Sequence, residues 1–104
     1  MDVFDLADNL RAEFQDKGLS DEDFLLRIAK AHDIKRVFVD SVANELFDKL
    51  PNERIAEVPE EGAENAKHLW FAFGIGKILL RDHGLEPSNF DCMQFSNRLL
   101  QLSL

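Results

Sequence analysis

The sequence predicts an all-α protein, an irregular bundle of about five helices around a helix 4 that is apolar on nearly every side. Apolar residues recur at helical spacing, and capping residues precede several of these stretches. We expect no strands, because no stretch shows the alternation of apolar and polar residues typical of them. The length of 104 residues predicts one helical domain over 1–104, and 45% hydrophobic residues suit a folded chain.

The first two helices are predicted by their capping residues. The first is expected over about 3–17, with Asp2 as its N-cap and Gly18 at its C-terminal end. The second begins after Ser20, a good N-cap, and Asp23 lies three residues later, an aspartate version of the capping box. Both stretches carry apolar residues at helical spacing, so both helices should pack one face against the core.

A third helix is expected from Asp33, its N-cap, to Leu50, because apolar residues recur there every four positions and Pro51 can end it. Lys35 and Arg36 fall in its first turn, where positive charge opposes the helix dipole. A helix that continues without a break from the second one would remove that conflict. Residues 51–62 are predicted to be a polar connection with at most one short turn around 54–58.

The central helix is expected over 63–83, with Gly84 ending it. Its apolar run 69–75 would also suit a buried strand, but apolar residues continue at helical spacing on both sides and favour helix. The last helix begins at Pro87 and Ser88, and Asp91 repeats the capping-box spacing. Its apolar residues are Phe90, Met93, Leu99, Leu100 and Leu102.

The central helix also carries the functional prediction. A helix that is apolar all round must be buried all round, which is difficult in a small domain, so one face is expected to remain open as an interface. The alternative is one large monomeric core. We therefore expect a small, acidic, non-enzymatic protein-interaction module, a regulator or inhibitor of the anti-activator or immunity type, that binds a protein partner and forms a homodimer. The expected interface residues are Phe71, Ile75, Ile78, Leu99, Leu100 and Leu102.

The distribution of charge leaves two further functions open. The net charge is −8, and acidic side chains dominate 1–26 and 37–62, so an acidic mimic of nucleic acid is one alternative. Residues 28–39 resemble a helix-turn-helix, although Val37 and Phe38 offer no hydrogen bonds to bases. Four of the chain's 12 lysine and arginine residues cluster in and next to this segment, and they could contact an acidic segment of a partner or DNA. This basic patch comprises Arg27, Lys30, Lys35 and Arg36.

Catalytic, metal and cofactor motifs are not evident in the sequence, and we expect no enzyme activity and no cofactor. Glu64 and His68 lie four apart, but a metal site needs a third ligand, so a surface ion pair is expected. Cys92 with His83 lacks an orienting group and is expected to be a structural thiol. The segment 74–76, Gly-Ile-Gly, lies inside a helix and indicates close packing or a kink.

A cytoplasmic location is the expectation from cysteine usage and from the N-terminus. A single cysteine cannot form an internal disulfide, which is typical of a reducing compartment. The first residues lack the basic start and apolar core of a signal peptide. The longest apolar run falls short of the roughly 18 residues needed to span a bilayer.

Overall fold

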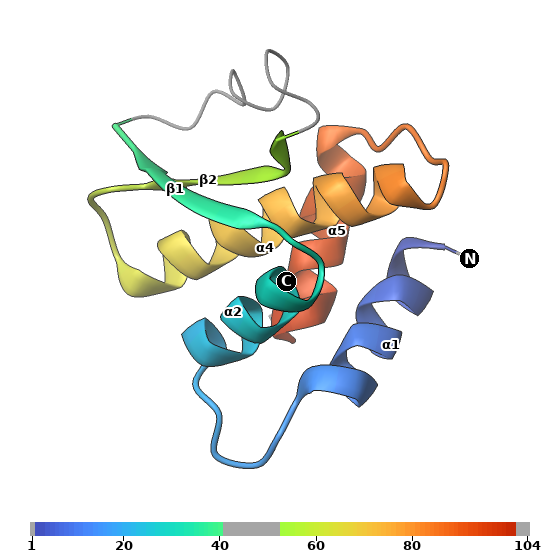
Figure 1. The fold of residues 1–104 in the computed structure, drawn as a ribbon, viewed down its shortest axis with the longest axis horizontal. Helices are drawn as coiled ribbons and strands as arrows, with labels where there is room; N and C mark the ends of the chain where they lie inside the picture. Colours follow the sequence, from blue (N-terminus) through green and yellow to red (C-terminus); the bar gives the residue numbers. More distant parts are fainter. Residues whose placement is uncertain (1, 41–52, 102–104) are drawn as a thin grey trace.

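A computed structural model describes residues 2–40 and 53–101, which form four α-helices and a two-stranded parallel sheet (Figure 1). The described chain is predominantly helical, as the sequence predicts, and the prediction that it contains only helices is wrong. In chain order, the elements are α1 (Val3–Phe14), α2 (Asp21–Ala31), β1 (Lys35–Val39), β2 (Ile55–Pro59), α4 (Glu64–Asp82) and α5 (Asn89–Leu100).

The starts of the first two helices agree with the capping residues of the sequence. The Asp2 side chain accepts a hydrogen bond from the Asp5 amide at 2.8 Å, and the Asp5 side chain caps the Asp2 amide in return. The Ser20 hydroxyl likewise accepts from the Asp23 amide at 3.1 Å. These bonds satisfy amides that a helix leaves unpaired at its first turn. The end of α1 is at Phe14, earlier than predicted.

Strand β1 corrects the prediction of a third helix that starts at Asp33. Asp33 has a left-handed φ of 56° after the end of α2, and Lys35–Val39 are extended. The run Val37-Phe38-Val39 is rich in the β-branched and aromatic types that strands favour. The conflict between Lys35 and Arg36 and a helix dipole disappears, because no helix begins there. The rest of the predicted third helix, 41–50, lies outside the described residues.

Strand β2 corrects the prediction of an irregular connection over 51–62. It runs parallel to β1, with Lys35 opposite Ile55 and Val39 opposite Pro59. Its first hydrogen bond to β1 links the Lys35 amide and the Arg54 carbonyl at 2.9 Å. Parallel pairing requires the intervening chain to cross back before β2 begins, so the contact is long-range and has no signal in local spacing.

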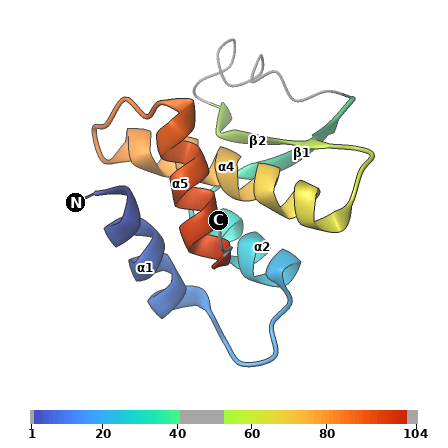
Figure 2. The same cartoon turned by 180° about the vertical axis from the view of Figure 1, so that it is seen from behind.

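Helix α4 lies at the centre of the fold, as predicted, and its run 69–75 is helical. The sheet and α2 pack against some sides of α4, and α5 packs against another side. Helix α5 crosses behind α4 in Figure 1 and in front of it in Figure 2. Helix α1 packs mainly against α5. Two glycines of α4 allow these close approaches, since Gly74 faces Ala56 of β2 and Gly76 faces Phe95 of α5.

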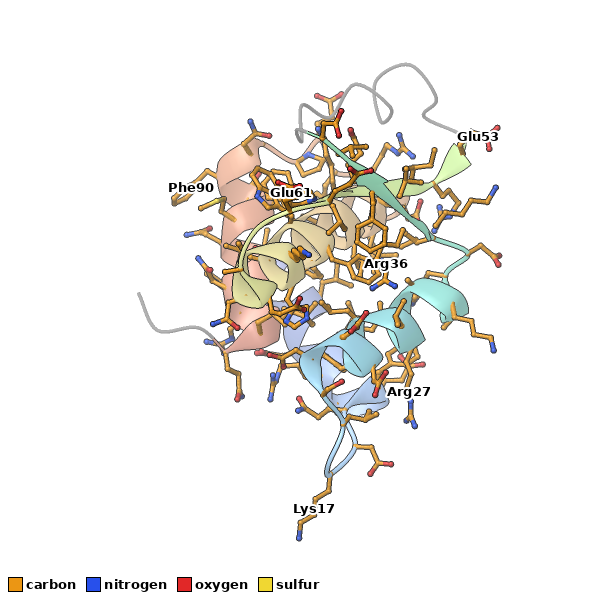
Figure 3. All side chains as sticks on the ribbon, turned by 90° about the vertical axis from the view of Figure 1, so that its left-hand side faces the viewer. Lys17, Arg27, Arg36, Glu53, Glu61 and Phe90 are labelled. Carbon is orange, nitrogen blue, oxygen red and sulfur yellow. The ribbon has the colours of Figure 1, made fainter. Side chains whose placement is uncertain are left out.

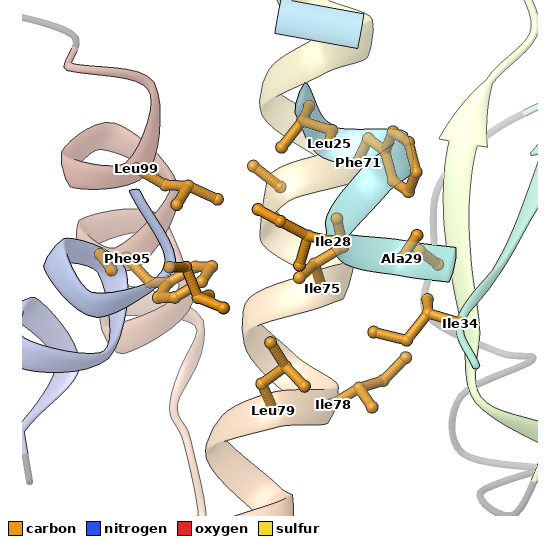
Figure 4. Packing of buried hydrophobic residues seen from close by; sticks show 14 of the residues in the cluster. Leu25, Ile28, Ala29, Ile34, Phe71, Ile75, Ile78, Leu79, Phe95 and Leu99 are labelled. Atoms are coloured by element: carbon orange, nitrogen blue, oxygen red, sulfur yellow. The ribbon is translucent and has the colours of Figure 1, made fainter. Parts of the chain in front are cut away.

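The hydrophobic core follows from this arrangement. Side chains from α2, α4 and α5 meet around α4, and Figure 4 shows them pointing toward one another. The largest fully buried side chains are Phe71, Phe95, Leu25, Ile28, Ile75, Ile78, Leu80, Leu99, Val58, Cys92 and Ser96.

Helix α5 begins at a capping box between Ser88 and Asp91, as predicted.

Candidate interaction surfaces

The residues predicted to form an exposed face of α4 are buried within the chain. Phe71 is 1% exposed, and Ile75 and Ile78 are 0% exposed. Leu99 of α5 is also fully buried, and Leu100 packs partly buried against the core. The prediction that these residues stay open for a partner is therefore wrong for Phe71, Ile75, Ile78 and Leu99. Side chains of α2 and Ile34 pack against the face of α4 that carries Ile75 and Ile78 (Figure 4). Leu102 lies outside the described residues.

The four basic residues singled out in the sequence lie on two elements. Arg27 and Lys30 are exposed on α2, and Lys35 and Arg36 belong to β1. Arg36 lies between β1 and α2, whereas Arg27 projects from the far side of α2 (Figure 3). The helix-turn-helix interpretation of 28–39 is wrong, because strand β1 occupies the position of its second helix.

Arg36 is held in place by three neighbours. Its guanidinium donates to Glu22 of α2 at 2.8 Å and lies over the rings of Phe38 and Phe71, 4.9 and 5.4 Å from their centroids. The hydrogen bond from Arg36 lowers the pKa of Glu22 below its ordinary value. Arg36 therefore ties β1 to α2 and α4.

A small cavity of about 170 Å³ lies beside Arg36 and continues along the first turns of α4. His68 lines it, and its Nε2 is 3.8 Å from the Glu64 carboxylate, which confirms the expected pair. The Nδ1 atom of His68 is buried and has no hydrogen-bond partner among the residues that the structure describes. Within 2–40 and 53–101, no group of three or more histidine, cysteine or carboxylate side chains is arranged to hold a metal ion.

Cys92 is a buried thiol, as the sequence predicts. Burial raises its pKa to about 11, so the thiol is neutral near pH 7. His83, the base considered for it, is exposed at the C-cap of α4. A nucleophilic cysteine needs a lowered pKa, so the environment of Cys92 opposes that role.

Helix α5 carries exposed apolar side chains that the sequence analysis named only as apolar residues of the last helix. Phe90 is 68% exposed and Met93 is 46% exposed. This exposure could have been predicted from a helical wheel, at about 100° per residue. The wheel places Phe90 and Met93 on the side opposite Cys92, Phe95 and Leu99. The stripe Cys92–Phe95–Leu99 is fully buried, which leaves Phe90 and Met93 pointing outward.

A groove of about 500 Å³ lies on the surface where α1 packs against α5, and residues of both helices line it. Arg98 makes two hydrogen bonds to the Asp8 carboxylate across it, at 2.9 and 3.0 Å, which lower the pKa of Asp8. Arg11 donates to the Leu99 carbonyl at 2.8 Å. The groove is lined by Phe4, Asp8, Arg11, Gln94, Asn97, Arg98 and Gln101.

We call Phe90, Met93 and this groove together the α5 surface. Phe90, Gln94 and Gln101 recur at helical spacing, so the exposed apolar residues and the groove follow one side of α5. Phe4, also partly exposed, borders the groove from α1 and lies under the Arg98 guanidinium, 5.6 Å from its ring centroid.

Comparison of the chain with protein-family models, curated proteins and solved structures finds no match. None of the described helices is both long and apolar enough to cross a lipid bilayer.

Proposed function

We propose that this protein works by binding another protein through the α5 surface, and not by catalysis. The observation that carries the proposal is the exposure of Phe90 and Met93, three residues apart on one face of α5. Aromatic residues and methionine are enriched at the centres of protein interfaces, and methionine adapts its shape to a partner. Burying such surface is favourable by roughly 25 cal/mol per Å².

The neighbouring groove would give the contact its specificity. Its polar side chains include amides that can both donate and accept hydrogen bonds, namely Gln94, Asn97 and Gln101. Asp8 and Arg98 already bond each other, so they form a fixed polar edge to the apolar residues. An apolar centre with a polar rim is the usual anatomy of a specific interface.

The charge of the chain indicates the kind of partner. With a net charge of −8, the protein attracts basic surfaces and repels acidic ones at long range. We therefore propose a partner with a basic surface around an apolar pocket, and a stoichiometric mode of action, as a regulator or inhibitor in the cytoplasm. Affinity would come mainly from Phe90 and Met93, and charge would mainly raise the association rate.

Site-specific photo-crosslinking in the native host tests this proposal. A benzophenone side chain at position 90 should give one discrete adduct with a protein, while the same group at exposed Lys17, in the α1–α2 loop, should not. Met93→Gln should weaken the adduct formed from position 90, and Lys17→Ser should leave it unchanged. If positions 90 and 17 give the same pattern, the α5 surface is not a binding site.

The salt dependence of the purified complex separates this proposal from mimicry of nucleic acid. An apolar contact should keep most of its affinity between low and high salt, whereas a charge-based mimic should lose affinity steeply. A partner that duplex DNA displaces, and that Met93→Gln leaves bound, would favour the mimic.

A further inference from the structure

The outer edge of strand β1 is a second candidate binding surface. The backbones of Lys35 and Val39 point toward β2 and bond the residues that flank it: the Lys35 amide donates to the Arg54 carbonyl, and the Val39 carbonyl accepts from the Glu60 amide. Backbone groups alternate in direction along a strand, so those of Arg36 and Phe38 point away from β2. The sheet has two strands in the part of the chain that the structure describes.

The two edges of this sheet differ chemically. On β2, the outward-pointing backbone groups belong to Ile55, Glu57 and Pro59, by the same alternation. Pro59 has no amide hydrogen, and proline is a common means of blocking an edge strand. Strand β1 contains no proline, so its edge keeps both the donors and the acceptors needed to pair with another strand.

Strand β1 also lies toward the outside of the fold. It is on the near side of β2 in Figure 1 and on the far side in Figure 2. Its Phe38 side chain is 47% exposed, although it is large and apolar. A neighbouring strand would cover this ring and pair the outward backbone groups in one step.

We propose that a second copy of this chain adds its own β1 antiparallel to this edge, so that two sheets join into one across a two-fold axis. The register follows from the backbone: outward-pointing Arg36 pairs with Phe38 of the second copy, and Val37 lies on the axis. In each Arg36–Phe38 pair, the amide of each residue then donates to the carbonyl of the other. Antiparallel strands commonly extend parallel sheets.

The side chains of β1 fit a second copy in this register. Arg36 faces the second copy's Phe38, which is the same cation–ring pairing that it makes within its own chain. Lys35 faces the second copy's Val39, so no like charges lie directly opposite.

This inference does not depend on the proposed function, because β1 and α5 are different surfaces. Light scattering or sedimentation at about 100 μM should give a mass near twice 11.9 kDa, the mass of one chain. Phe38→Arg, which would place an arginine opposite Arg36, should reduce the mass to that of one chain while the helical circular dichroism persists. Phe90→Ser should leave the dimer intact.

Cysteine cross-linking tests the register directly. In the proposed dimer, the two copies of Val37 face each other with Cα atoms about 4.5 Å apart, within the range of a disulfide. The two copies of Val39 would lie roughly 13 Å apart, from about 3.3 Å per residue. Mild oxidation should therefore cross-link Val37→Cys and leave Val39→Cys and the wild type, with its buried Cys92, as single chains.

Three results would overturn this inference. The first is a wild-type protein that stays monomeric at 100 μM. The second is a dimer in which Val39→Cys cross-links as readily as Val37→Cys. The third is a dimer that Phe90→Ser dissociates, which would assign the contact to the α5 surface instead.

Discussion

Replacement of Gly76 by alanine should destabilise this protein, although the same change stabilises most helices. Gly76 lies inside α4, where it is packed against the ring of Phe95 from α5. An alanine Cβ at this position would be 2.4 Å from Cδ1 of that ring, closer than atoms approach without a shift. Phe95 is itself fully buried, so its ring cannot swing into solvent to make room.

The magnitude follows from two opposing effects. Alanine is favoured over glycine in a helix interior by about 1 kcal/mol. Inserting a methyl group into a packed core is unfavourable by about 1–3 kcal/mol. Since the contact is deep inside the van der Waals distance, we expect the upper part of that range and a net loss of about 1–2 kcal/mol in the free energy of unfolding.

Urea and thermal unfolding, followed by circular dichroism, measure this loss. For a chain of this size, a loss of 1 kcal/mol lowers Tm by roughly 4–8 °C. The control is Gly76→Ala in a Phe95→Leu background, where the smaller side chain leaves room and the alanine should be less unfavourable than in the wild type. A single Gly76→Ala variant that is more stable than the wild type would refute the close packing of α4 on α5.

Three further predictions follow from the described contacts. Arg54→Ala should lower stability by about 1–2 kcal/mol, because its guanidinium bonds both the His32 carbonyl and the Asp82 carboxylate. Arg54 also lowers the pKa of Asp82 below its ordinary 3.8, so the contribution of the Arg54–Asp82 pair is present above that pH and is lost as pH falls through the folded pKa. The difference in stability between the two proteins should therefore shrink in acid to the part that comes from the His32 carbonyl. Cys92 should not react with a thiol reagent at pH 8 until urea unfolds the chain, since it is buried with its pKa raised to about 11; fast reaction of the native protein would contradict this. Ser20→Ala should lower stability by about 1 kcal/mol through the loss of the N-cap of α2, and an unchanged melting curve would count against the Ser20–Asp23 bond.

The sequence by itself determined the local features of the fold. The capping residues Asp2, Ser20 and Ser88 each lie at the start of a helix, because their side chains bond amides only three residues away. The central helix was also predictable, since apolar residues recur at helical spacing over its whole length. Interactions between residues close in the sequence can be predicted from the spacing of residue types alone.

The sheet was decided by tertiary structure. The pairing of β1 with β2 joins residues twenty positions apart in register, as Lys35 opposite Ile55 shows. The two basic residues at the expected start of a third helix were the local sign that this helix was wrong. They could not show what replaced it, because a strand is stabilised by a partner distant in the sequence.

Tertiary structure also decided which surfaces are open. The face of α4 that carries Ile75 and Ile78 was expected to be exposed, but side chains of α2 and Ile34 pack against it. Phe90 and Met93 are as apolar as the residues of the core, but the orientation of α5 against α1 and α4 turns them outward. Apolar character favours burial, but the packing of segments distant in the sequence decides which apolar side chains are buried.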